Sequence, residues 1–135
     1  MKRAYLLLFI AFLFGCNTQS EESKLLFQFL KDKSISEKAT VYLLIPIMSC
    51  GHCTEESISF MDSYEDNPKI QFVASGDSKR DLKRVLGQKA EWSNVFLDVK
   101  NTAFAEGINN GGVTAFVILE NQALERRNFD PTNIK

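Results

Sequence analysis

The sequence predicts one α/β domain with a mainly parallel central sheet, helices on both faces and a C-terminal antiparallel hairpin. Strand-like apolar segments alternate with segments of helical spacing, which is the order that builds parallel sheets. The chain has 135 residues, enough for a single small domain. Its 44% hydrophobic and 24% charged content is typical of a folded chain and not of a disordered one.

Residues 1–15 are expected to form a lipoprotein signal peptide. The positive pair Lys2-Arg3 precedes an apolar stretch, Tyr5 to Phe14, that is too short to span a bilayer. The segment Leu13-Phe14-Gly15-Cys16 resembles a bacterial lipobox, in which the cysteine is lipidated and becomes the mature N-terminus. We therefore expect Cys16 to carry lipid. An ordinary cleaved signal peptide and a short anchor are the alternatives.

Residues 16–37 are expected to form a tether before a folded domain of residues 38–135. The polar segment 17–23 suits a solvated linker. Within 24–33 the apolar residues Leu26, Phe27, Phe29 and Leu30 predict a short amphipathic helix. Two arrangements remain open for this helix: it packs on the domain, or it stands as a stalk.

The first strand and the helix after it flank the most informative motif of the chain. The run 40–47 is apolar almost throughout, as expected for a strand buried on both faces. The motif Cys50-Gly51-His52-Cys53 follows it. Helical spacing then begins at Cys53 and ends near Asn67-Pro68, because the residue before a proline disfavours the helical conformation.

The remaining segments continue the alternation of strands and helices. Ser78 and Asp81 have the spacing of a helix N-terminal cap. Gly107 closes a short helix, and residues 109–112 form a loop. The other expected elements are strands at 69–74, 94–99, 113–119 and 124–129 and helices at 78–86 and 101–106.

The three cysteines divide into one lipid site and one pair. Once Cys16 carries lipid, Cys50 and Cys53 remain, and disulfides persist in the compartments that exported proteins occupy. Free N–H groups and the macrodipole at a helix N-terminus favour thiolate over thiol, and Cys50 is expected at such a place. Redox chemistry is therefore favoured. A structural disulfide that clips the helix end is the alternative.

No metal, cofactor or nucleic acid is expected. A zinc site needs four ligands, and Cys50, His52 and Cys53 are the only soft donors beside Cys16. Copper(I), which accepts two thiolates, is a minor alternative. The formal net charge is −1 and no basic stripe is visible, so the composition does not suit nucleic-acid binding.

The element order, with C-x-x-C after the first strand, resembles the thioredoxin superfamily over residues 38–129. The tetrapeptide Cys50-Gly51-His52-Cys53 is similar to the one in protein disulfide isomerase domains. The resemblance implies that Cys50 is the exposed nucleophile and Cys53 the resolving cysteine. It also implies that partial positive charge on His52 stabilises the Cys50 thiolate and makes the disulfide more oxidising.

The resemblance further implies a substrate-facing loop at Gly112, Val113 and Thr114. Members of the superfamily place a cis-proline before the strand that faces the motif, and this chain has Val113 there. A cis bond before valine would cost about 2.5–4 kcal/mol, so a trans bond is expected. Strand 113–119 is expected beside the strand that delivers the motif, which would bring the loop against Cys50.

These features predict a lipid-anchored thiol-disulfide oxidoreductase that faces the periplasm from the cell envelope. Its expected partners are exported protein thiols or disulfides, a membrane or periplasmic redox partner and, through Cys16, the lipid membrane. The chain is expected to act as a monomer. A non-catalytic thioredoxin-fold binding or accessory lipoprotein with a structural disulfide is the alternative from another functional class.

Overall fold

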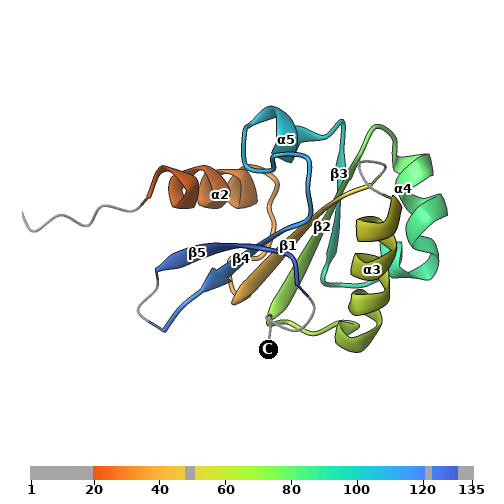
Figure 1. The fold of residues 1–135 in the computed structure, drawn as a ribbon, viewed down its shortest axis with the longest axis horizontal. Helices are drawn as coiled ribbons and strands as arrows, with labels where there is room; N and C mark the ends of the chain where they lie inside the picture. Colours follow the sequence, from red (N-terminus) through yellow and green to blue (C-terminus); the bar gives the residue numbers. More distant parts are fainter. Residues whose placement is uncertain (1–19, 48–50, 121–122, 131–135) are drawn as a thin grey trace, which may run out of the picture.

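The computed structural model describes residues 20–47, 51–120 and 123–130, and of residues 51–53 the backbone only. The described chain is an α/β fold built on a five-stranded sheet of order β3-β2-β1-β4-β5 (Figure 1). The expected α/β class is therefore confirmed.

Strands and helices follow one another in the expected order. The strands are β1 (Val41–Pro46), β2 (Ile70–Gly76), β3 (Val95–Val99), β4 (Thr114–Ile118) and β5 (Leu124–Asn128). The helices are α2 (Glu21–Asp32), α3 (Gly51–Met61), α4 (Lys79–Leu86) and α5 (Thr102–Ala105), with short 3₁₀ helices η1 (Asp62–Tyr64) and η2 (Gly87–Glu91).

The sheet is mixed, which corrects the expectation of a mainly parallel one. β1 pairs parallel with β2, and β2 pairs parallel with β3. On its other edge β1 pairs antiparallel with β4, and β4 pairs antiparallel with β5. The expected C-terminal hairpin is present, and its first strand, β4, pairs with β1. Antiparallel pairs therefore make up half of the sheet.

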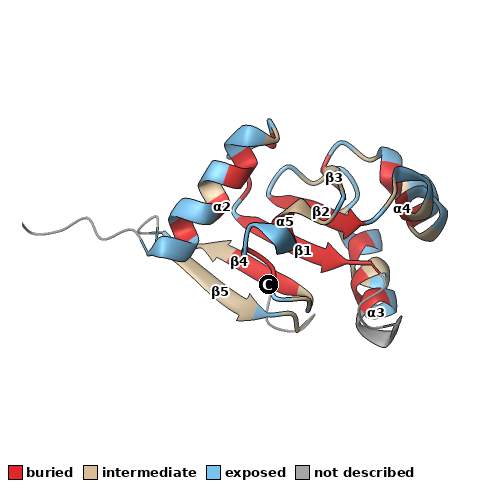
Figure 2. Cartoon of the chain, turned by 90° about the horizontal axis from the view of Figure 1, so that it is seen from above, coloured by how far each residue is buried: buried red, intermediate tan, exposed pale blue. Residues whose placement is uncertain are grey.

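Helices cover both faces of the sheet, as expected: α3 and α4 lie on one face and α2 and α5 on the other (Figures 1 and 2). All six residues of β1 are buried, which confirms the inference from its apolar run. Leu43 and Ile45 join the core under α3 and α4. Tyr42 and Leu44 join the second core, under α2 and α5. The alternation follows from the period of two in a strand.

α2 belongs to the packed unit. Leu26, Phe29 and Leu30 have no exposed surface and share a core cluster with Tyr42 and Phe116. The helix begins earlier than its apolar spacing predicts, because the Ser20 side chain accepts a hydrogen bond from the Ser23 N–H at 3.2 Å and caps it. Of the two arrangements left open, the helix takes the packed one. The core thus reaches back past the expected domain start at residue 38.

Local signals around α4 behave as expected. The Ser78 hydroxyl oxygen accepts the Asp81 N–H at 3.1 Å and caps the helix. Gly87 ends it with φ of 58°, a left-handed conformation that favours glycine. Gly76, the last residue of β2, has a packing role: a Cβ there would lie 2.8 Å from Leu82 Cδ2. Glycine therefore allows α4 to approach the strand closely.

Candidate functional site

The cysteine motif spans the junction between β1 and α3. β1 ends at Pro46 and α3 begins at Gly51. Cys50 lies outside the described residues, as does Cys16. The backbone of His52 and Cys53 is helical. Helix therefore begins at the residue that directly follows the first motif cysteine, two residues earlier than the apolar spacing predicts.

The N-terminal half of α3 is tied to the end of β1. Thr54 is buried, and its hydroxyl donates to the Pro46 carbonyl at 3.5 Å. Beyond Pro46 the chain keeps its contact with β2, because the Ile47 N–H donates to the Ser75 carbonyl at 2.9 Å. The first bond holds the start of α3 close to the central strand, and the second keeps the chain beyond that strand beside β2.

The expected substrate-facing loop enters β4 at the same end of the sheet. Thr114 is buried, and its hydroxyl donates to the Gly112 carbonyl at 3.2 Å. Val113 is half-buried and packs against the core under α3 and α4, while its carbonyl accepts the Phe129 N–H at 3.3 Å. The described chain contains no cis peptide bond, so the expected trans bond between Gly112 and Val113 is confirmed.

The register of β1 and β4 places this loop relative to the motif. The last antiparallel pair joins Leu44 to Thr114. Two residues separate Leu44 from the end of β1, and the loop precedes Thr114. Paired strands lie about 4.8 Å apart, so Val113 and Gly112, which precede Thr114, lie near the last residues of β1. The expected pairing of these two strands is therefore confirmed. The contact between Val113 and Cys50 falls outside the described residues.

Asp98 is a buried carboxylate that the sequence analysis missed. It is 1% exposed and accepts the Ser75 hydroxyl at 2.9 Å. It also accepts the N–H groups of Thr102 at 3.1 Å and Ala103 at 2.9 Å, together with the Thr102 hydroxyl. These bonds join β2, β3 and the start of α5. With its oxygens fully engaged, Asp98 is a structural link and not a reactive acid.

Tyr42 is a second buried titratable group, on the face that α2 covers. Its side chain has no exposed surface, and its hydroxyl donates to the Ser36 carbonyl at 3.0 Å. Burial, followed by the negative charge of Glu37, raises the pKa of Tyr42 to about 12. The phenol is therefore neutral at physiological pH and serves as a hydrogen-bond donor.

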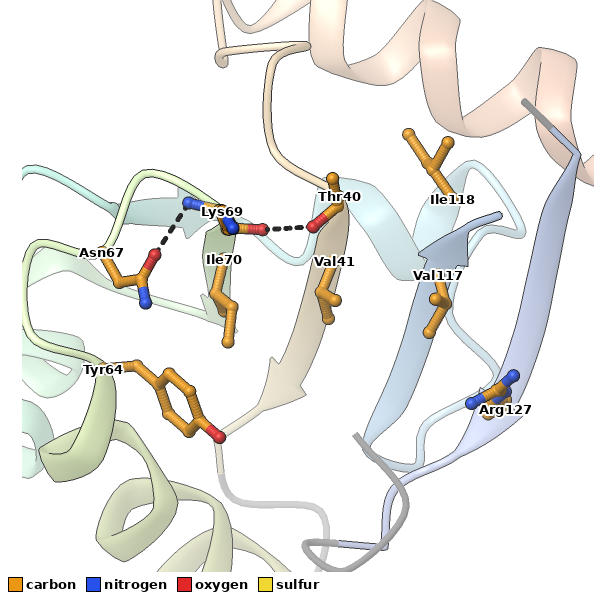
Figure 3. Close-up of a pocket in the computed structure, with 9 residues that line it drawn as sticks. All are labelled: Thr40, Val41, Tyr64, Asn67, Lys69, Ile70, Val117, Ile118 and Arg127. Carbon is orange, nitrogen blue, oxygen red and sulfur yellow. Dashed lines mark hydrogen bonds between the residues drawn. The ribbon is translucent and has the colours of Figure 1, made fainter. Parts of the chain in front are cut away.

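A cavity of about 340 Å³ lies at the opposite end of the sheet from the motif (Figure 3). An apolar strip of Val41, Ile70 and Val117 lies between Tyr64 and Arg127 (Figure 3). The volume of the cavity is at the lower end of the range for small-molecule sites. The full lining is Thr40, Val41, Tyr64, Asn67, Lys69, Ile70, Val117, Ile118 and Arg127. Val41 and Ile70 are the first residues of β1 and β2, so this cavity is separate from the end of β1 that leads into the motif.

No protein-family model, curated protein or solved structure matches this chain. Among residues 20–47, 51–120 and 123–130, no helix is long and apolar enough to cross a membrane. Over the same residues, no three histidine, cysteine, aspartate or glutamate side chains are grouped as a metal site would require.

Proposed function

We propose that this chain is a lipid-anchored thiol-disulfide oxidoreductase with a thioredoxin-like fold, which acts on exported proteins through Cys50 and Cys53. One observation carries the proposal. Helix α3 begins at Gly51, directly after Cys50, and it is the element that follows the buried central strand β1. A cysteine next to the free N–H groups of a helix start has a lowered thiol pKa and a larger thiolate fraction at neutral pH.

The arrangement of the neighbouring elements also supports the proposal. β1 is flanked by β2 and β4, and the loop before β4 meets the end of β1 that leads into the motif. Such a loop has the position in which the resemblance to thioredoxins expects substrate to dock. Active sites of open sheets that contain parallel strands commonly lie beyond the carboxyl ends of those strands, where this motif follows β1.

The proposed reaction is a two-step exchange of sulfur bonds. The Cys50 thiolate attacks one sulfur of a partner disulfide, forms a mixed disulfide and releases the other partner sulfur as a thiolate, which takes up a proton. The Cys53 thiolate then attacks the Cys50 sulfur, which forms the Cys50–Cys53 disulfide and releases the second partner thiol. Two electrons pass from the cysteine pair to the partner. The same steps in reverse oxidise a partner dithiol, and relative reduction potentials set the direction.

One feature favours a second candidate function, a non-catalytic accessory lipoprotein. Val113, with its trans bond, stands where the superfamily carries a cis-proline. In this alternative Cys50 and Cys53 form a disulfide that only clips the start of α3.

Trapping and potentiometry separate the two functions. A Cys53→Ser variant should accumulate mixed disulfides with exported partners through Cys50, since the resolving thiol is absent. The matched Cys50→Ser variant should accumulate none. A catalytic pair should also have a reduction potential above about −300 mV, whereas structural disulfides of secreted proteins lie below it. A reduction potential below about −300 mV, together with no mixed disulfide in the Cys53→Ser variant, would establish the structural disulfide.

A further inference from the structure

The first turn of α2 is the part of the described domain closest in sequence to the proposed lipid. α2 begins at Glu21, and its packed face is buried from Ser23 onward. Only residues 17–20 separate it from Cys16. A chain spans at most about 3.6 Å per residue, so Glu21 lies within roughly 18 Å of the lipidated cysteine. Lipidation of Cys16 would therefore hold this end of the domain at the membrane surface.

Contacts with α2 and β1 show that the β4–β5 hairpin lies near the start of α2. Arg126 of β5 forms an ion pair with Glu22 at 3.0 Å. Beyond Ile118, the β4–β5 hairpin closes with the Leu119 N–H donating to the Ala123 carbonyl at 2.9 Å. The Ile118 N–H donates to the Thr40 carbonyl at 2.8 Å, which places the hairpin end beside the start of β1. The start of α2 and this hairpin both lie at the left end of the molecule in Figure 1.

Two exposed leucines lie on these same elements. Leu25 of α2 is 43% exposed, and Leu119 at the hairpin end is 37% exposed. The third large apolar side chain exposed on the described part of the chain is Phe104, at 57%. Phe104 belongs to α5, beside the Gly111 loop at the other end of β1. Leu25 and Leu119 therefore lie at one end of the described domain, and Phe104 lies elsewhere.

Two of the acidic residues near the two leucines form ion pairs within the protein, and a third, Glu120, follows Leu119 and is exposed. Glu21 contacts Lys24 at 3.3 Å, and Glu22 contacts Arg126 at 3.0 Å. The two ion pairs are neutral and Glu120 adds one negative charge, so electrostatic attraction to anionic lipid does not drive a contact at this end. A contact with lipid here depends mainly on apolar side chains and on the short tether.

We propose that the end of the domain formed by the first turns of α2 and the β4–β5 hairpin rests on the lipid surface, with Leu25 and Leu119 in the interfacial layer. The proposal rests on the lipidation of Cys16, which is part of the proposed function. Lipid is the occupant because the four-residue connection brings a bilayer to this surface, whereas no comparable connection brings a second protein.

The orientation has a consequence for the redox site. The six residues of β1 separate the hairpin end from the motif end by about 20 Å. The end of β1 that leads into the motif therefore lies on the side of the domain away from the membrane. Partners reach it from the aqueous side, as soluble proteins or as domains that project from the bilayer.

Depth-dependent quenching of tryptophan fluorescence tests the orientation. Leu25→Trp and Leu119→Trp are each placed in a Trp92→Phe background, and Phe104→Trp serves as the matched distal control. The lipidated full-length proteins are reconstituted in phosphatidylethanolamine and phosphatidylglycerol vesicles with brominated acyl chains, and flotation measures the anchoring. Circular dichroism verifies that each variant is folded. Tryptophan at 25 and 119 should be quenched relative to unbrominated vesicles, and tryptophan at 104 should not.

The outcomes separate this proposal from the proposed function. Vesicle-bound protein with no quenching at 25 and 119, or with stronger quenching at 104, would overturn the orientation and leave the anchored oxidoreductase in place. Protein that does not float with vesicles would refute the lipid anchor itself, and the orientation with it. An emission shift that depends on protein concentration, without quenching, would identify a second copy of the chain as the occupant and overturn the proposal.

Discussion

Thr114, the first residue of β4, lies directly opposite Leu44 of β1 in the antiparallel register. This pair is the last one before the two strands part. From here one chain continues through Pro46 toward the cysteine motif, and the other comes from the loop at Gly112 and Val113. The pairing places the loop near the end of β1 that leads into the motif, and the first prediction depends on it.

Replacing Val113 by proline should increase disulfide-reductase or isomerase turnover. In the thioredoxin superfamily, proline at this place orients the substrate backbone and blocks metal access. Gly111 and Gly112 precede residue 113 and allow the loop to accept a cis peptide bond before the new proline. The variant should also lose any copper(I) or other metal bound adventitiously by Cys50 and Cys53. Val113→Ala, which keeps the backbone N–H, is the matched control. A folded Val113→Pro protein with unchanged exchange rates and unchanged metal binding would show that the loop does not face the cysteines.

The Cys50 thiol is expected to titrate below the value of a free cysteine. Its place directly before the first residue of α3, next to His52, favours the thiolate. The rate of alkylation, measured against pH in a Cys53→Ser variant, should have its midpoint below about 8.5. His52→Pro should make the couple more reducing, since it removes a positive charge that stabilises the thiolate. A midpoint at the free-thiol value would instead support the structural disulfide.

Asp98→Asn should destabilise the domain strongly for a single isosteric change. The carboxylate accepts hydrogen bonds from Ser75, Thr102 and Ala103, and an amide would present N–H groups to some of these donors. Loss of a hydrogen bond to a charged group lowers the free energy of unfolding by about 1.5–3 kcal/mol. Urea denaturation at neutral pH measures the change.

Asp62→Asn provides the matched control for this substitution. Asp62 forms an ion pair with Lys89 at 2.6 Å, but its side chain is 61% exposed. A surface pair of this kind contributes about 0–1 kcal/mol. If the two variants lost equal stability, Asp98 would not hold β2, β3 and α5 together in the way the structure indicates.

Stability should fall between pH 10 and pH 12 because of Tyr42. The unfolded phenol titrates near 10.0, whereas burial raises the pKa of the folded phenol to about 12. The unfolded chain therefore releases its proton first as the pH rises. The contribution is complete below pH 10 and is lost toward pH 12, by at most about 2.7 kcal/mol.

A Tyr42→Phe variant should lack this part of the alkaline decline, because it has no phenol to ionise. At neutral pH it should lose about 0.5–1.5 kcal/mol with the hydrogen bond to the Ser36 carbonyl. Tyr64→Phe, a change at a half-buried tyrosine, should leave the decline in place. Thermal unfolding followed from pH 8 to pH 12 makes the comparison. An undiminished decline in Tyr42→Phe would assign it to other groups.

Local patterns in the sequence predicted most of the elements but not all of their neighbours. The unbroken apolar run of β1 identified a strand buried on both faces, and Ser78 identified the start of α4. The place of β4 beside β1 was predicted from the resemblance, but its antiparallel direction was missed, because a strand's own residues do not indicate in which direction it pairs. The early start of α2 was missed because polar residues such as Ser20 and Glu21 suit a linker and a helix cap equally well.

The functional and buried polar residues also differ in how far the sequence predicts them. Cys50, His52 and Cys53 were predicted from the motif spacing and its flanking elements, since a motif of this kind lies within a few consecutive residues. Asp98 was not identified, because its partner Ser75 comes from another strand and only the folded sheet brings the two side chains together. A single acidic residue in an otherwise apolar strand, followed by Thr102, is the signal that was available.

The central place of β1 also affects the timing of folding. β1 is the first strand along the chain, yet one of its two edges is covered by β4, the fourth. A chain that is still being synthesised or threaded through a membrane has not yet delivered residues 114–118, so that edge has no native partner. Native pairing between strands so far apart in the sequence is slow. Until it occurs, the uncovered apolar edge of β1 can pair with other chains. The fold therefore closes late, and a holding chaperone would have its greatest effect in the interval before β4 emerges.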